Sequence, residues 1–168
     1  MERSRNVVFV SHCILNQNVL PKNLERFSGA FKEILSLLTE HGVGIIQLPC
    51  PEFEFLGLNR DFRIKRNFTN KYREKCSLFA DSIIDQIRKY LQNNYRVLAI
   101  IGVDSSPSCA PMKINNGKRD VLGKGIFVEE IENKMQKEKF QIPIIGISFG
   151  RQIESINKIQ KLLKYSDF

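Results

Sequence analysis

Four short apolar runs, each followed by an amphipathic helical pattern, constrain the fold of this chain more than any other feature. The runs are rich in Val and Ile and cover residues 7–11, 43–48, 96–103 and 142–148. Runs of this length and composition are typical of parallel strands that are buried on both faces. The sequence therefore predicts an α/β fold.

The segments between these runs carry helical periodicity. Phe31, Ile34, Leu35 and Leu38 fall on one helix face, and a longer pattern covers residues 69–94. Further helices are expected over residues 125–139 and after Arg151. Because βαβ crossovers are right-handed, this order predicts a small doubly wound, Rossmann- or flavodoxin-like sheet. We expect four mostly parallel strands in the order 2-1-3-4, with helices on both faces.

Length and composition suit a small globular protein. A chain of 168 residues without an internal linker or repeat is expected to form one domain over residues 1–168. No apolar stretch is long enough to cross a bilayer, and the one behind the charged N-terminus is interrupted by Ser11 and His12. We therefore expect a cytoplasmic protein.

The four cysteines of the chain are too few for a disulfide scaffold and favour metal binding or catalysis.

Three of the cysteines follow predicted strands. Cys13 and Cys50 lie two residues beyond the first and second strands, and Cys109 lies a few residues beyond the third. The carboxyl ends of parallel strands meet at one edge of the sheet, where ligands bind. The sequence thus predicts that the three thiols share a site, although free cysteines are commonly just small core residues. Cys76 falls on the apolar face of the helix over residues 69–94 and is assigned to the core.

Three thiolates suit more than one metal. Structural zinc normally takes four ligands, frequently from C-x-x-C pairs, and this chain has no such pair. A catalytic zinc with His12 as an added ligand stays open. Iron-sulfur clusters are also held by thiolates, and three cysteines would leave one iron of a cubane free for an outside molecule.

Two residues near the cysteines are candidates for proton transfer. Glu52, two residues after Cys50, is a candidate general acid or base, with an ion pair to Arg60 or Arg63 at the surface as the alternative. Ser106 could relay a proton or bind substrate, although a hydroxyl before Pro107 commonly caps a turn.

Several motifs resemble those of one known family. They are S-H-C-I-L-N-Q-N at 11–18, C-P-E at 50–52 and S-P-S-C at 106–109, followed in order by residues 123–129 and 142–146. Together they resemble the thiouracil desulfidase family over nearly the whole chain. The resemblance implies a [4Fe-4S] cluster held by Cys13, Cys50 and Cys109, with catalytic roles for Glu52 and Ser106. It also implies non-redox removal of sulfur from a small thiolated heterocycle such as 2-thiouracil.

The chain departs from the usual family pattern near two cysteines. His12 and residues 16–18 replace smaller residues, and Ala110 replaces a glycine after Cys109. These changes indicate a divergent branch and leave the substrate open. Two alternatives to a desulfidase also stay open: a zinc-dependent hydrolase or deaminase-like enzyme, and a non-catalytic iron-sulfur protein that carries sulfur or senses redox state.

The chain has a net charge of +8, and its densest basic segment is residues 60–75. Such a segment could steer an anionic nucleotide or a thiolated RNA toward the site. A solvated loop and helix start is the simpler interpretation, because no recognised RNA-binding motif accompanies the charge. We therefore expect a small thiolated heterocycle or nucleotide as the substrate and do not favour a nucleic-acid partner.

Overall fold

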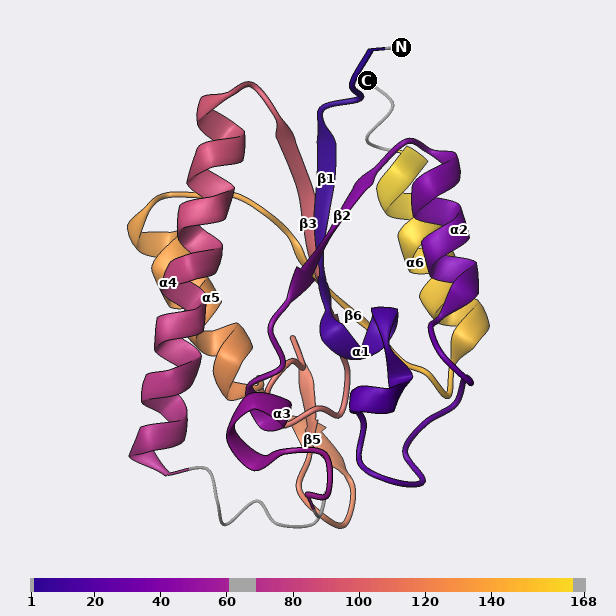
Figure 1. The fold of residues 1–168 in the computed structure, drawn as a ribbon, viewed down its shortest axis with the longest axis vertical. Helices are drawn as coiled ribbons and strands as arrows, with labels where there is room; N and C mark the ends of the chain where they lie inside the picture. Colours follow the sequence, from indigo (N-terminus) through magenta and orange to yellow (C-terminus); the bar gives the residue numbers. More distant parts are fainter. Residues whose placement is uncertain (1, 61–68, 165–168) are drawn as a thin grey trace.

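The main sheet has the predicted composition and strand order. The computed structural model describes residues 2–60 and 69–164 of the chain (Figure 1). Four parallel strands lie in the order β2-β1-β3-β6, which confirms the predicted α/β class and the 2-1-3-4 arrangement. Their bounds are Asn6–Ser11 for β1, Gly44–Leu48 for β2, Arg96–Val103 for β3 and Ile144–Ile147 for β6.

Two long helices pack on each face of this sheet (Figure 1). One face carries α4 (Asn70–Gln92) and α5 (Ile126–Lys137), and the other carries α2 (Lys32–Glu40) and α6 (Gln152–Lys164). Each pair closes its own apolar core against the sheet. None of the helices in the described ranges is both long and apolar enough to span a membrane.

The central strand β1 shows why its sequence is apolar throughout. Val7 and Phe9 belong to the core under α4 and α5, whereas Val8 and Val10 belong to the core under α2 and α6. Successive side chains of a strand point to opposite faces, so a strand covered on both faces needs apolar residues at every position. The structure thus explains the continuous apolar run from which a strand buried on both faces was predicted.

Short elements that the sequence did not predict gather beyond the carboxyl end of the sheet (Figure 1). They are α1 (His12–Leu15), the 3₁₀ helix η1 (Gln17–Val19), α3 (Pro51–Leu56) and an antiparallel hairpin of β4 (Lys113–Asn115) and β5 (Asp120–Leu122). Pro51 opens α3 directly after Cys50, at a helix position where its fixed φ and missing N–H are well tolerated. These elements build the candidate site.

Candidate functional site

Cys13, Cys50 and Cys109 line one cavity at the carboxyl end of the sheet. Cys13 lies in α1, Cys50 directly precedes α3, and Cys109 lies in the loop between β3 and β4. The cavity has a volume of about 420 Å³, and its wall also includes His12, Glu52, Arg60 and Ser106. All three cysteines are free thiols. The fold thus brings together cysteines that are separated by up to 96 residues in the chain (109 − 13).

Burial favours the protonated form of these thiols. It raises the pKa of Cys50 to about 11, with a further contribution from the charge of Glu52. Burial likewise raises the pKa of Cys13 and of Cys109, and the Cys50 thiol adds to both shifts. A metal that bound here would displace protons from the thiols, since only the thiolate is a ligand.

Two glycines allow the loop that carries Cys109 to pack closely. A Cβ at Gly102 would lie 2.2 Å from the Cys109 carbonyl oxygen, and one at Gly125 would lie 2.3 Å from the Ser108 carbonyl group. Any other residue at either position would push the loop away. The first N–H groups of α5 also hold this loop, since those of Phe127 and Val128 both donate to the Ser108 carbonyl. The position of Cys109 is therefore fixed by β3 and α5 together.

Gln17 supports the segment that carries Cys13. Its Nε2 donates a hydrogen bond of 2.6 Å to the Cys13 carbonyl, and its Oε1 accepts one of 3.0 Å from the backbone N–H of Arg26. Gln17 is buried. The run at residues 16–18, noted above as a departure from the family pattern, thus includes a residue that braces a cysteine.

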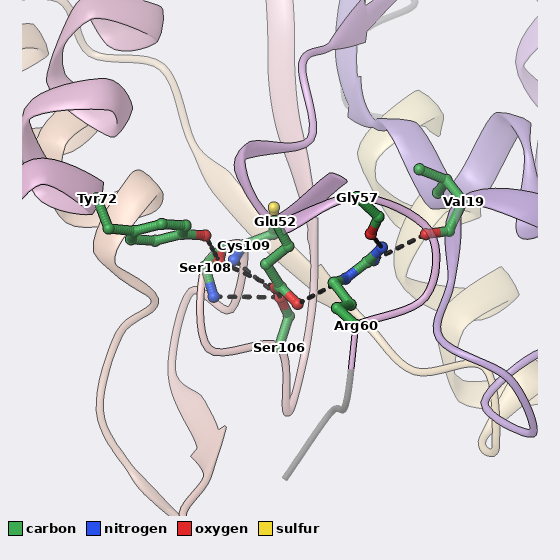
Figure 2. Close-up of polar contacts among 8 residues, drawn as sticks. All are labelled: Val19, Glu52, Gly57, Arg60, Tyr72, Ser106, Ser108 and Cys109. Carbon is green, nitrogen blue, oxygen red and sulfur yellow. Dashed lines mark hydrogen bonds and ion pairs between the residues drawn. The ribbon is translucent and has the colours of Figure 1, made fainter. Parts of the chain in front are cut away.

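Glu52 lies between hydroxyl groups and a guanidinium group (Figure 2). Its Oε1 is 2.9 Å from the Ser108 hydroxyl and 3.5 Å from the Ser106 hydroxyl, and its Oε2 is 3.6 Å from Nε of Arg60. The alternative reading of Glu52 was a surface ion pair, but this pair is largely buried, with side-chain exposures of 4% for Arg60 and 15% for Glu52. Arg63, the other proposed partner, lies outside the described residues.

Ser106 has both arrangements considered from the sequence. Its hydroxyl oxygen accepts hydrogen bonds from the backbone N–H groups of Ser108 (3.2 Å) and Cys109 (3.0 Å), which is the geometry of a turn cap. The same hydroxyl lies in the cavity wall within reach of Glu52. One side chain therefore holds the Cys109 backbone and contacts the carboxylate.

Three residues of this site did not emerge from the sequence as site residues. The two terminal nitrogens of Arg60 donate to the carbonyls of Gly57 (2.8 Å) and Val19 (2.7 Å), and its Nε faces Glu52 (Figure 2). Ser108 and Tyr72 are fully buried and lie 2.5 Å apart through their hydroxyls. Tyr72 falls within the predicted helix over residues 69–94, so its ring is expected in the core. The one signal of a further role is its hydroxyl group, because a buried tyrosine hydroxyl usually has a hydrogen-bond partner.

The metal-binding capacity of the cavity depends on the thiols. Within residues 2–60 and 69–164, no three His, Cys, Asp or Glu side chains lie close enough together to hold a single metal ion. His12 packs edge-on against Phe53, and burial lowers its pKa. The donor set of three thiols is the one that iron-sulfur clusters use, and the cavity is many times larger than the roughly 30 Å³ of a water molecule. The chemistry of the donors and the volume of the cavity that they line therefore fit a cluster.

Cys76, Lys71, Arg73 and Lys75 are not among the residues that line the cavity. Cys76 is fully buried on α4, as expected for a core residue, and burial raises its pKa to about 12. Three of the seven basic residues of the segment, Arg63, Lys65 and Arg66, fall at positions 61–68, outside the described residues. Arg73 pairs with two glutamates on α5, and Lys75 lies 4.7 Å from the centre of the Phe79 ring. These two cations have structural partners.

Comparison with known proteins gives one close relative in sequence. The chain matches no protein-family model. It is 35% identical over 163 residues to the uncharacterized protein MJ0003 of Methanocaldococcus jannaschii, a match that covers 96% of this chain and 97% of that protein. The chain belongs to the MJ0003 family. The match spans the positions of the three cysteines and of Glu52.

A solved structure extends the comparison at the level of the fold. The MJ0003-family chain superposes on the [4Fe-4S]-dependent thiouracil desulfidase TudS with a TM-score of 0.57 and 14% sequence identity. The likeness covers 95% of this chain and 99% of TudS. At this identity the likeness shows a shared fold, and it agrees with the motif resemblance found in the sequence.

Proposed function

We propose that this chain is a [4Fe-4S]-dependent desulfidase that removes sulfur from the thiocarbonyl group of a small heterocycle such as 2-thiouracil. One observation carries the proposal: three thiols, a carboxylate and a cavity-lining hydroxyl from distant segments meet around one cavity. The shared fold with TudS and the ordered motifs support the same activity. Cys13, Cys50 and Cys109 would hold the cluster, and Glu52 and Ser106 would act on the substrate.

The reaction exchanges sulfur for oxygen without a change of oxidation state. A thiocarbonyl and water give a carbonyl and hydrogen sulfide, so the oxygen comes from water and both of its protons end on sulfur. A bound cluster would supply a Lewis-acidic iron with an open coordination position for the thiocarbonyl sulfur. The protein must then bind the heterocycle and move protons.

In this proposal Glu52 moves a proton. Its carboxylate would take a proton from water as the water oxygen bonds to the thiocarbonyl carbon, and would return it as the sulfur leaves. The Ser106 hydroxyl, 3.5 Å from Glu52, would carry a proton between the carboxylate and the substrate. Arg60, 3.6 Å from Oε2, would hold the carboxylate in its orientation before it acts.

The cavity suits a small substrate. Its volume of about 420 Å³ lies in the range of pockets that enclose small molecules. We propose a thiolated base or its nucleotide as the substrate class, in a cytoplasmic setting. The test is anaerobic reconstitution of the chain, followed by a screen of thiolated bases and nucleotides for sulfide release, with iron and zinc measured in the same preparation.

A further inference from the structure

A chain of buried hydroxyl groups leads from α4 to the Glu52 carboxylate. The hydroxyls of Tyr72 and Ser108 are 2.5 Å apart, and the Ser108 hydroxyl is 2.9 Å from Oε1 of Glu52 (Figure 2). Tyr72 and Ser108 are both 0% exposed. The three residues come from α4, the loop before β4 and α3, so the chain joins three separate parts of the fold at one carboxylate.

The proton count fixes the direction of this chain. A serine hydroxyl has a single proton, and an ionised carboxylate can only accept hydrogen bonds. When Glu52 is ionised, Ser108 must therefore donate to Glu52, and Tyr72 must donate to Ser108. A phenol keeps its proton at neutral pH, so Tyr72 can always fill this role.

The two sides of the carboxylate are held by different groups. Ser108 contacts Oε1, while Arg60 faces Oε2 at 3.6 Å. A glutamate side chain has several rotatable bonds and can adopt many rotamers, and contacts at both carboxylate oxygens restrict it to few of them. We propose that Tyr72 and Ser108 are positioning residues, which hold the Glu52 carboxylate at the cavity through this chain. The inference rests on the proposed function, in which Glu52 moves a proton.

The ring and the hydroxyl group of Tyr72 have different kinds of contact. The ring packs edge-on against Phe55 of α3, with centroids 5.4 Å apart, and the rest of the residue belongs to the core under α4 and α5. Phenylalanine would fill the same space. A buried hydroxyl is unfavourable unless it is hydrogen-bonded, so a tyrosine here serves its polar partners, Ser108 and the Cys76 thiol one turn along.

The first test observes Glu52 in the full chain without metal. Glutamate is labelled with carbon-13 at the carboxyl carbon, and the Glu52 resonance is identified by its loss in Glu52→Gln. We expect Tyr72→Phe and Ser108→Ala each to displace this resonance. The control is Tyr90→Phe. Tyr90 lies on the same helix, and its ring packs against Phe9 and Tyr95, so loss of its hydroxyl should leave the Glu52 resonance in place. A Glu52 resonance that stays in place in both test variants would overturn the proposal.

The second test measures turnover in the reconstituted protein. Tyr72→Phe and Ser108→Ala should lower kcat per bound cluster about 10- to 100-fold, as expected when a reacting group loses its support, with KM and iron content unchanged. A lower melting temperature with unchanged kcat per cluster would show a structural role only and would overturn the inference. If the unmodified protein released no sulfide from any substrate, the proposed function would fail. The Glu52 resonance would still decide whether Tyr72 and Ser108 position the Glu52 carboxylate.

Discussion

The Ser108 hydroxyl lies 0.6 Å closer to Oε1 of Glu52 than the Ser106 hydroxyl does, at 2.9 Å against 3.5 Å. The two serines have different surroundings, because Ser108 is fully buried whereas Ser106 lines the cavity. The closer serine therefore has no access to a substrate, and the more distant one does. This arrangement divides the S-P-S-C segment into a residue that holds the carboxylate and a residue that faces the cavity.

Removing the charge of Glu52 should stop turnover without removing the cluster. Glu52→Gln keeps the size of the side chain but cannot accept a proton, so sulfide release per cluster should fall about 100- to 10,000-fold. Iron content should not change, since Glu52 is not proposed as a ligand. Glu54→Gln on the same helix, where the side chain is exposed, is the control and should keep full activity. Equal activity in both variants would remove Glu52 from the mechanism.

The ligand assignment predicts which cysteines the cluster needs. Serine at Cys13, Cys50 or Cys109 should each abolish the brown colour and most of the bound iron and sulfide after anaerobic reconstitution. Cys76→Ser should keep them, because Cys76 is a core residue of α4. Iron and acid-labile sulfide per chain are the measurement. Loss of the cluster in the Cys76 variant alone would contradict the assignment.

The buried pair of Arg60 and Glu52 should matter for stability. Arg60→Met leaves Glu52 without its cation and should lower the free energy of unfolding by about 3 kcal/mol. This is the lower end of the range for breaking a buried ion pair, because two hydroxyl groups still contact Glu52. The matched control is Arg73→Met. The ion pairs of Arg73 lie at the surface, so their loss should lower the free energy of unfolding by at most about 1 kcal/mol. Denaturant unfolding of the two variants compares them. Equal losses would mean that burial adds nothing to the Arg60 pair.

Alkylation of Cys50 should depend steeply on pH. Its pKa of about 11 means that the reactive thiolate is scarce at neutral pH and grows about tenfold per pH unit up to that value. In the chain without metal, the rate of Cys50 modification by iodoacetamide should therefore rise about 100-fold from pH 7 to pH 9. Mass spectrometry of the Cys50 peptide gives the rate. A rate that levels off below pH 8 would show a thiol that is already ionised.

Most of the fold could be predicted because local patterns and sheet geometry determine it. The strand Arg96–Val103 is a continuous apolar run because both of its faces are buried, and the helix around Cys76 and Ile83 repeats its apolar residues at helical spacing because one of its faces is buried. The hairpin of β4 and β5 was missed because its strands have three residues each and alternate weakly. Asn116-Gly117, between the strands, is the turn signal that could have revealed it.

The site could be predicted only where it depends on strand ends. Cys13, Cys50 and Cys109 follow strands, so parallel topology alone brings them together. Tyr72 contacts Ser108 because α4 packs beside α5, whose first N–H groups hold the loop between β3 and β4, and no local pattern encodes that contact. Arg60 was read as a surface residue because nothing in its neighbourhood shows that the carbonyls of Gly57 and Val19 enclose it.

Sulfide release by the reconstituted protein tests the central claim most directly. The chain is loaded anaerobically with iron and sulfide, desalted, and incubated with 2-thiouracil and with thiolated nucleosides and nucleotides, while a zinc-loaded sample and the Cys109→Ser variant serve as controls. The proposed function predicts that the iron-loaded chain alone releases sulfide repeatedly, with one carbonyl product formed per sulfide. Turnover by the zinc-loaded chain, or a loaded cluster with no turnover of any thiolated compound, would contradict it.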